Sequence, residues 1–183
     1  IILNSSVPQL VISRCFPALN FDLIFSNVHN GFIDPHLRQL NWKMVHRILP
    51  VKYLLFARNI PQDKNCILCK AQPELMDHLF LKCTRIQSLV NFVSLFIQKW
   101  FGFKILLAPN KVIFLLDLPV QFPHTFLYII SLYKSIIWIF RNRICFDAYR
   151  LQPGDLVSAF CSALIARVQV DYFRFSHDKF RRY

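Results

Sequence analysis

Residues 66–83 read CILCKAQPELMDHLFLKC and contain four side chains of the kinds that bind transition metals. Two residues separate Cys66 from Cys69, and a cysteine pair at this spacing can hold one metal ion from a tight turn. His78 and Cys83 follow closely and can complete a tetrahedron of soft ligands. The spacing therefore predicts a structural zinc site, with all four coordination positions filled by the protein and none left for a catalytic water.

The alternative is that the three cysteines are reduced core residues and that the histidine lies on the surface. Four ligand types within so short a stretch favour zinc. Three thiolates and a neutral imidazole around Zn²⁺ give a net charge of about −1. Four cations around the site can balance this charge: Lys64, Lys70, Lys82 and Arg85. Pro73 and Glu74 are expected to begin a helix that carries His78.

The composition of the chain limits its possible functions. The 183 residues are 55% hydrophobic, which is enough to bury a core, and the net charge of +12 favours polyanions such as nucleic acid or an acidic membrane surface. The three glycines are scattered, which excludes Gly-rich phosphate loops and the nucleophile elbow. The sequence has no Asp-Asp pair, no His-x-Glu and no His-Glu-x-x-His, so polymerase, zinc-deaminase and zincin chemistry are disfavoured. We therefore expect a protein that is not an enzyme.

The cysteine usage and the N-terminus indicate a reducing, intracellular location, either nuclear or cytoplasmic. Six cysteines are too few for a disulfide scaffold of this length, and no basic secretory n-region is present. Cys15, Cys145 and Cys161 are therefore expected to be buried thiols. The first residue is Ile, which suggests a processed chain, a fragment or a piece of a larger reading frame.

A membrane span is not expected. The most apolar segment, 126–140, has Lys134 at its centre and is shorter than the roughly 20 residues that a span needs. We expect this segment to be a buried core helix and expect no membrane partner.

Hydrophobic periodicity and helix-capping residues predict a mainly helical chain. A capping box is expected at Thr84 and Gln87. The predicted helices are 34–49, 51–58, 86–100, 123–149 and one with an apolar stripe over 156–168, whereas 111–117 is expected to be strand or loop. The fold class is therefore mainly α: a helical domain with a small CCHC zinc knuckle at its edge. Three regions are predicted: an N-terminal segment (1–33), a helical zinc-binding region (34–101) and a C-terminal helical region that packs on the same core (102–183).

Several short motifs together resemble one known family. They are Trp42-Lys43, Leu49-Pro50, the Cys66 to Cys69 pair, Pro73-Glu74 and His78-Leu79-Phe80-x-x-Cys83, followed by Trp138-x-x-Arg141-Asn142. This pattern resembles the zinc-binding region at the C-terminal end of reverse transcriptases from non-LTR (LINE-type) retrotransposons. The chain departs from that pattern at Leu75, where Thr or Ser is common, and it lacks polymerase and endonuclease motifs.

The resemblance implies a noncatalytic zinc-binding module that helps a larger enzyme to hold template RNA or target DNA during target-primed reverse transcription. RNA or single-stranded DNA is then the expected partner, with the polymerase portion of the same polyprotein as a further one. Lys134, Trp138 and Arg141 share one helical face and could contact nucleic acid. The candidate nucleic-acid contacts are Lys64, Lys70, Lys82, Arg85, Lys134, Trp138, Arg141 and Arg143.

Two alternatives remain open at this point. Trp138 can equally be a core residue past which the cations snorkel, and Arg141-Asn142 can be a structural pair that ties helix ends together. The module as a whole can also be a zinc-stapled interaction domain that docks on a polymerase or another partner through exposed apolar surface.

Overall fold

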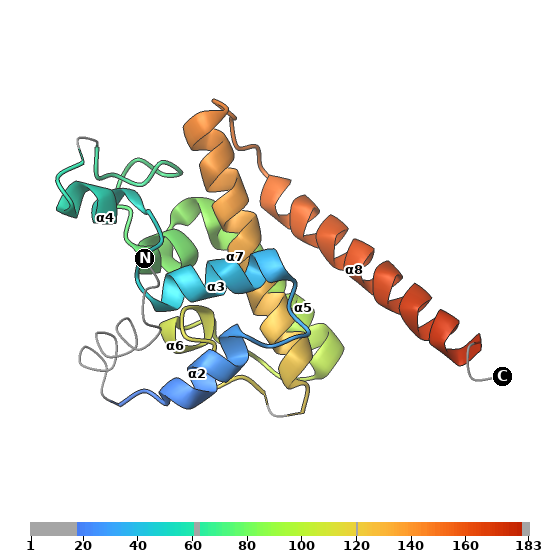
Figure 1. The fold of residues 1–183 in the computed structure, drawn as a ribbon. Helices are drawn as coiled ribbons and strands as arrows, with labels where there is room; N and C mark the ends of the chain where they lie inside the picture. Colours follow the sequence, from blue (N-terminus) through green and yellow to red (C-terminus); the bar gives the residue numbers. More distant parts are fainter. Residues whose placement is uncertain (1–17, 61–62, 120, 181–183) are drawn as a thin grey trace.

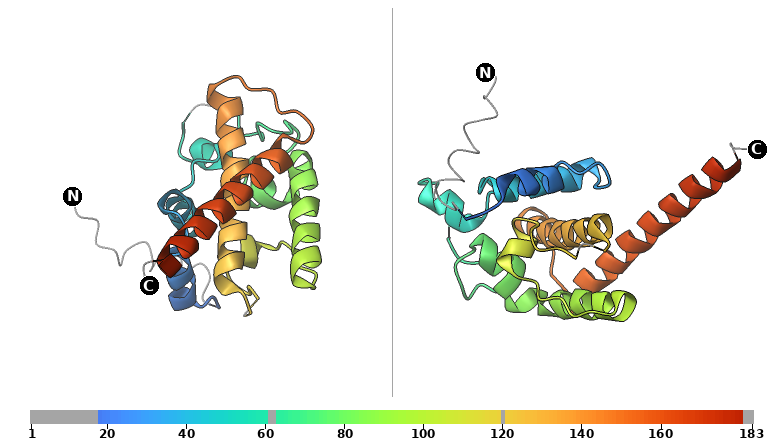
Figure 2. Two further views of the ribbon diagram at one scale, coloured as in Figure 1. Left: turned by 90° about the vertical axis from the view of Figure 1, so that its right-hand side faces the viewer. Right: turned by 90° about the horizontal axis from the view of Figure 1, so that it is seen from below.

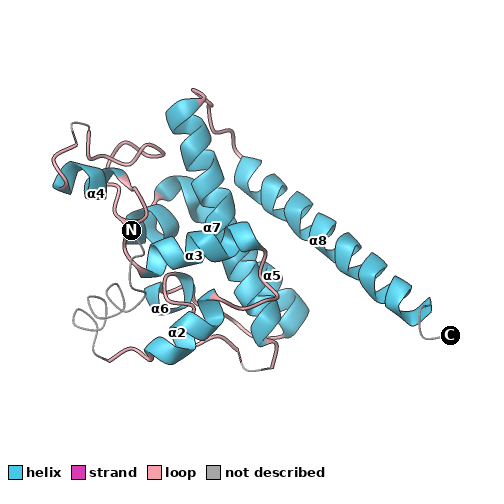
Figure 3. Ribbon diagram, viewed as in Figure 1, coloured by secondary structure: helices cyan, strands magenta, loops and turns pink. Residues whose placement is uncertain are grey.

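The computed structural model describes residues 18–60, 63–119 and 121–180 (Figure 1). Helices make up 63% of the structure, and the described residues contain no strand, only an isolated bridge between Asn65 and Pro73 (Figure 3). The predicted mainly α fold is confirmed. Residues 1–17, which include Cys15, lie outside the described part of the chain.

Most of the helical elements follow one another with short connections, but the segment 58–77 between α4 and η1 is long. In chain order they are α2 (Phe21–Val28), α3 (Pro35–Val45), α4 (Lys52–Ala57), the π-helical turn η1 (His78–Lys82), the 3-10 turn η2 (Thr84–Ile86), α5 (Gln87–Phe101), α6 (Pro109–Val112), α7 (Pro123–Phe146) and α8 (Asp155–Phe180). Proline begins α3 and α7, as predicted, because its fixed φ suits the first helical position. Gly102 ends α5 in the left-handed conformation, also as expected.

Helix α7 is the central element of the fold. It lies between the layer of α2 and α3 and the layer of α5 (Figure 2), and it also contacts α6, α8 and η1. A buried hydrogen bond of 2.8 Å from Asn41 Nδ2 to Ser131 Oγ links α3 to α7, and the rings of Phe101 and Phe126 link α5 to α7 at 4.9 Å. The segment 126–140 is almost entirely buried, which confirms the expected core helix.

Helix α8 buries apolar side chains in the core through its first turns, and further along Arg167 pairs with Asp34 at 2.8 Å. Leu156 and Phe160 are buried, but Val168 is 60% exposed because the rest of α8 diverges from the body (Figures 1 and 2). The predicted stripe over 156–168 is therefore only half buried. By length and apolar composition alone, the segment Asp155–Phe173 could cross a membrane, and little of it is buried.

The segment 111–117 is mostly loop, which is one of the two expected forms: α6 ends at Val112, and Leu115 and Asp117 in the following turn have positive φ. The expected capping box at Thr84 and Gln87 does not form: no side-chain cap hydrogen bond is present there, and the Gln87 amide donates to the carbonyls of Leu81 and Cys83 at 3.1 Å. Trp100, the last residue of the predicted helix 86–100, is 69% exposed.

Lys134 lies in the middle of α7 with a fully buried side chain. Its ammonium nitrogen has no hydrogen-bond partner among the described residues. Burial lowers the pKa of Lys134 to about 7, because the charged form loses its hydration. Lys134 therefore contributes bulk to the core, and it does not contribute a cation to the surface.

We expect Lys134→Met to stabilise the folded chain at pH 7. The unfolded chain keeps its proton on Lys134 up to about pH 10.5, whereas the folded chain releases it near pH 7, so wild-type stability rises with pH across this window. The advantage of the variant should therefore shrink by up to about 1.4 kcal/mol per pH unit between pH 7 and 9. Denaturant unfolding of both zinc-loaded proteins measures this difference. The exposed-site control Lys99→Met should show no such trend, and a pH-independent difference for Lys134→Met would contradict the assignment.

Candidate metal centre

The first two metal ligands lie in a tight loop between α4 and η1. The Cys66 N–H donates to the Gln72 carbonyl and the Lys70 N–H donates to the Cys66 carbonyl, both at 2.7 Å. Lys70 adopts a left-handed φ of 59°, which turns the chain back after Cys69. These contacts fold the loop so that the sulfur atoms of Cys66 and Cys69 face the same point.

The last two ligands flank a single π-helical turn. The Cys83 N–H donates to the His78 carbonyl at 2.7 Å, which closes the wide i→i+5 ring of η1. This turn returns the chain to the same side after five residues, so Cys83 stands beside His78. A helix was predicted to begin at Pro73 and Glu74, but helical structure begins only at Met76. The reason is that Pro73 pairs with Asn65 and that the Glu74 N–H donates to the carbonyl of Lys64 at 2.9 Å.

The four predicted ligands converge on one point. Their ligand atoms all lie within 4.8 Å of one another. The Sγ atoms of Cys66 and Cys83 are 3.9 Å apart, and Cys69 Sγ is 3.3 Å from His78 Nε2. A tetrahedron built on Zn–S and Zn–N bonds of typical length has edges of about 3.8 Å between sulfurs and about 3.6 Å between sulfur and nitrogen. The donor set and its spacing therefore fit one zinc ion.

The protonation of the ligands also suits a metal. Burial is the largest effect on His78 and lowers its pKa, which favours the neutral imidazole that a metal requires. A hydrogen bond between the thiols of Cys66 and Cys83 raises the pKa of Cys66 and lowers that of Cys83. The two sulfurs thus share a proton that a bound cation would displace.

A buried ion pair connects the metal loop to the rest of the fold. Arg141 donates to Glu74 Oε1 from Nη2 at 2.8 Å and from Nε at 3.1 Å, and the two side chains are 4% and 0% exposed. The same carboxylate accepts the N–H of Lys52, at the start of α4, at 2.9 Å and that of Ile67, in the cysteine loop, at 3.1 Å. Arg141 also donates to the Pro50 carbonyl at 3.4 Å. One ion pair therefore joins the cysteine loop, α4, the Leu-Pro turn and α7.

The candidate nucleic-acid contacts separate into two groups. Lys134 and Arg141 are buried, so their prediction as contacts to nucleic acid is corrected: periodicity placed them on one face of α7 but could not show that this face is covered. Trp138 is half-buried, with the Arg141 guanidinium 5.0 Å from its ring centroid. The geometry supports the alternative interpretation of Arg141, in which this residue has a structural role and does not contact nucleic acid. The exposed candidates are Lys64, Lys70, Lys82, Arg85 and Arg143.

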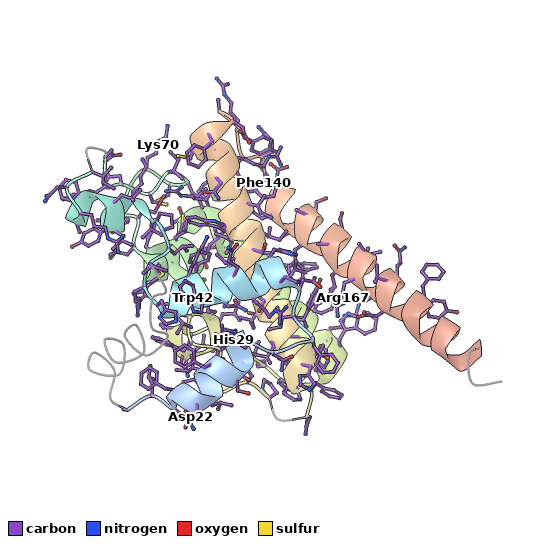
Figure 4. The ribbon with its side chains drawn as sticks, in the orientation of Figure 1. Asp22, His29, Trp42, Lys70, Phe140 and Arg167 are labelled. Atoms are coloured by element: carbon purple, nitrogen blue, oxygen red, sulfur yellow. The ribbon has the colours of Figure 1, made fainter. Side chains whose placement is uncertain are left out.

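Most of the exposed candidates lie near the metal loop. Lys70 is on the outer edge of the structure, beside α4 (Figure 4). Arg85 donates to the carbonyl of Leu151 at 3.0 Å, and Arg143 lies 4.1 Å from the ring centroid of Tyr149 near the end of α7.

The expected burial of the other thiols is only partly met: Cys145 is exposed, since the last turn of α7 extends past the core, and Cys161 is half-buried.

Sequence reasoning quoted Glu74 as a helix start and missed its pairing with Arg141. The sequence contained a signal for this pairing, because Glu74 and Arg141 both belong to the motifs that resemble the family pattern. An acidic residue between two metal-ligand pairs and an arginine on an apolar helix both need a partner when they are buried.

Comparison with known proteins supports this interpretation of the site. Residues 14–89 match the model of a family described as zinc-binding in reverse transcriptase. The matched segment contains all four ligands, and the match confirms the family resemblance recognised from the sequence. Comparison with curated proteins and with solved structures gave no match.

We expect Glu74→Gln to lower the free energy of unfolding by about 3–5 kcal/mol, because it leaves the buried Arg141 guanidinium without its counter-charge. The double variant Glu74→Gln/Arg141→Met should be more stable than the sum of the single effects implies. Denaturant unfolding of the zinc-loaded proteins measures this double-mutant cycle. Asp171→Asn, which removes a more exposed carboxylate, is the control and should cost about 1 kcal/mol or less. Additive effects of the two single substitutions would contradict the proposed coupling.

Proposed function

We propose that this chain is a noncatalytic module of a LINE-type reverse transcriptase that binds RNA or single-stranded DNA through the surface around its zinc site, within an intracellular, reducing compartment. In this role it assists the handling of template RNA or target DNA during target-primed reverse transcription. The match to a reverse transcriptase zinc-binding family supports the proposal that the chain is part of a reverse transcriptase. The positive charge around the metal site supports nucleic acid as the partner.

The observation that carries the proposal is a group of exposed cations around the metal ligands that form no salt bridge among the described residues. Four exposed side chains, Lys64, Lys70, Lys82 and Arg85, come from the segments around the four metal ligands. Among the described residues, none of the four forms a salt bridge. The acids of these segments pair with other cations. Glu74 is buried and paired with Arg141. Asp63 lies 3.8 Å from the Lys52 ammonium group, and Asp77 lies 4.0 Å from the Arg47 guanidinium group. A phosphate backbone needs several such charges close together.

Zinc contributes to this surface by fixing the loops that carry the cations. The segment 63–83 has little regular structure apart from η1, so its shape depends on the metal ligands and on the Glu74 contacts. Binding at this surface requires positioned charges only, and the closed ligand set provides no open metal position for catalysis.

A second candidate function is docking on the polymerase portion of the same polyprotein. A groove of about 380 Å³ between α5, α7 and α8 is lined mainly by apolar side chains, including Trp100, Tyr128 and Val168. Exposed apolar residues continue beyond it along α8, such as Tyr172 and Phe173 at 70% and 61% exposure. A surface of this kind is typical of protein contacts.

A charge-matched pair of triple variants tests the proposal. We expect Lys64→Gln/Lys70→Gln/Lys82→Gln to weaken binding to a single-stranded oligonucleotide and to reduce the slope of log K against log salt by about two, since each lost phosphate contact removes about 0.7. Lys99→Gln/Lys104→Gln/Lys111→Gln removes the same charge elsewhere and should have a much smaller effect. Fluorescence anisotropy across a salt series measures both variants.

Equal losses in the two triple variants would show that only net charge matters and would contradict a defined surface. Unchanged affinity in both, with binding of the polymerase portion intact, would favour the docking function.

A further inference from the structure

Helix α4 exposes two aromatic rings that the fold does not use. Tyr53 and Phe56 are 43% and 49% exposed, and no residue of α4 is fully buried. Neither ring has an aromatic partner among the described residues. Residues three apart lie on the same face of a helix, so both rings project from one side of α4.

The position of α4 is set by its backbone. The N–H of Lys52 donates to Glu74 Oε1 at 2.9 Å and that of Tyr53 donates to the Glu74 carbonyl at 3.4 Å. These bonds fix the start of α4 against the metal loop without using either ring. The aromatic side chains are therefore held on a fixed support with their surfaces partly free.

The segment that carries the two rings is rich in cations, and one of these cations lies beside a ring. Between residues 52 and 70 the chain has four cations and one acid, and that acid, Asp63, lies 3.8 Å from the Lys52 ammonium group. Arg58, Lys64 and Lys70 are exposed and form no salt bridge among the described residues. The Lys64 ammonium lies 5.9 Å from the centroid of the Phe56 ring, which places positive charge directly beside an aromatic surface.

We propose that Tyr53 and Phe56 form a stacking platform for the unpaired bases of a single-stranded nucleic acid, whose phosphates contact Arg58, Lys64 and Lys70. Exposed aromatic rings within a positively charged surface are the combination by which proteins hold single strands with little regard to sequence. The bases of a duplex are stacked on one another and cannot use such a platform. This inference rests on the proposed function and assigns the bases, as well as the phosphates, to a defined part of the surface.

Stacking is tested by changing the rings and the bases separately. The two probes are a single-stranded oligonucleotide and one of equal length with abasic sites throughout. We expect Tyr53→Ala/Phe56→Ala to weaken binding of the first probe by about tenfold or more, with little effect on the second and no change in salt slope. Wild type should bind the abasic probe more weakly by a similar factor.

Two further variants serve as controls. Tyr172→Ala/Phe173→Ala removes an exposed aromatic pair from α8 and should change neither affinity. Tyr53→Leu/Phe56→Leu keeps apolar bulk on α4 but removes the aromatic faces, so it should lose affinity as the alanine variant does. Zinc content and helicity, measured for each protein, should match wild type because neither ring is buried.

The outcomes separate the platform from the proposed function. Equal weakening on both probes would overturn stacking, as would unchanged affinity of the alanine variant. In both cases the proposed function would still hold, provided that the wild-type chain binds the single-stranded probe. A wild-type chain that binds neither probe would overturn both proposals.

Discussion

The ion pair between Glu74 and Arg141 is the interaction on which the arrangement of this chain depends. It joins residues 67 positions apart, and it is nearly or fully excluded from solvent on both sides. The Glu74 carboxylate also binds the backbone of α4 and of the cysteine loop, and Arg141 also binds the carbonyl of Pro50. A buried charge that loses its partner is costly, so these segments are held together as one unit.

The ion pair and the metal ligands have complementary roles. The ligands fix the local shape of the segment 66–83, of which the first part, 66–75, buries only Cys66 and Glu74. The ion pair then attaches this segment to α7, the central helix of the core. The family motifs acquire a common physical reason in this way, because the Leu-Pro turn, Pro73-Glu74 and Arg141-Asn142 meet at the same contact.

The sequence allowed some of these features to be predicted and not others, for physical reasons. The ligands Cys66, Cys69, His78 and Cys83 were predictable because their constraint is local in the chain. The π-helical turn was not, since it depends on the closure of the metal loop more than on propensity. Lys134 and Arg141 were wrongly predicted to be exposed. Hydrophobic periodicity identifies a solvent-exposed face only on a helix that has such a face, and α7 is covered on nearly all sides.

Three thiolates and one imidazole of this chain hold a single structural zinc ion. X-ray absorption at the zinc edge of the purified, zinc-loaded protein tests this assignment. We expect four-coordinate zinc with three sulfur ligands at about 2.3 Å and one nitrogen ligand at about 2.0–2.1 Å. A site with fewer sulfur ligands, with coordinated water or with six oxygen and nitrogen neighbours would contradict it.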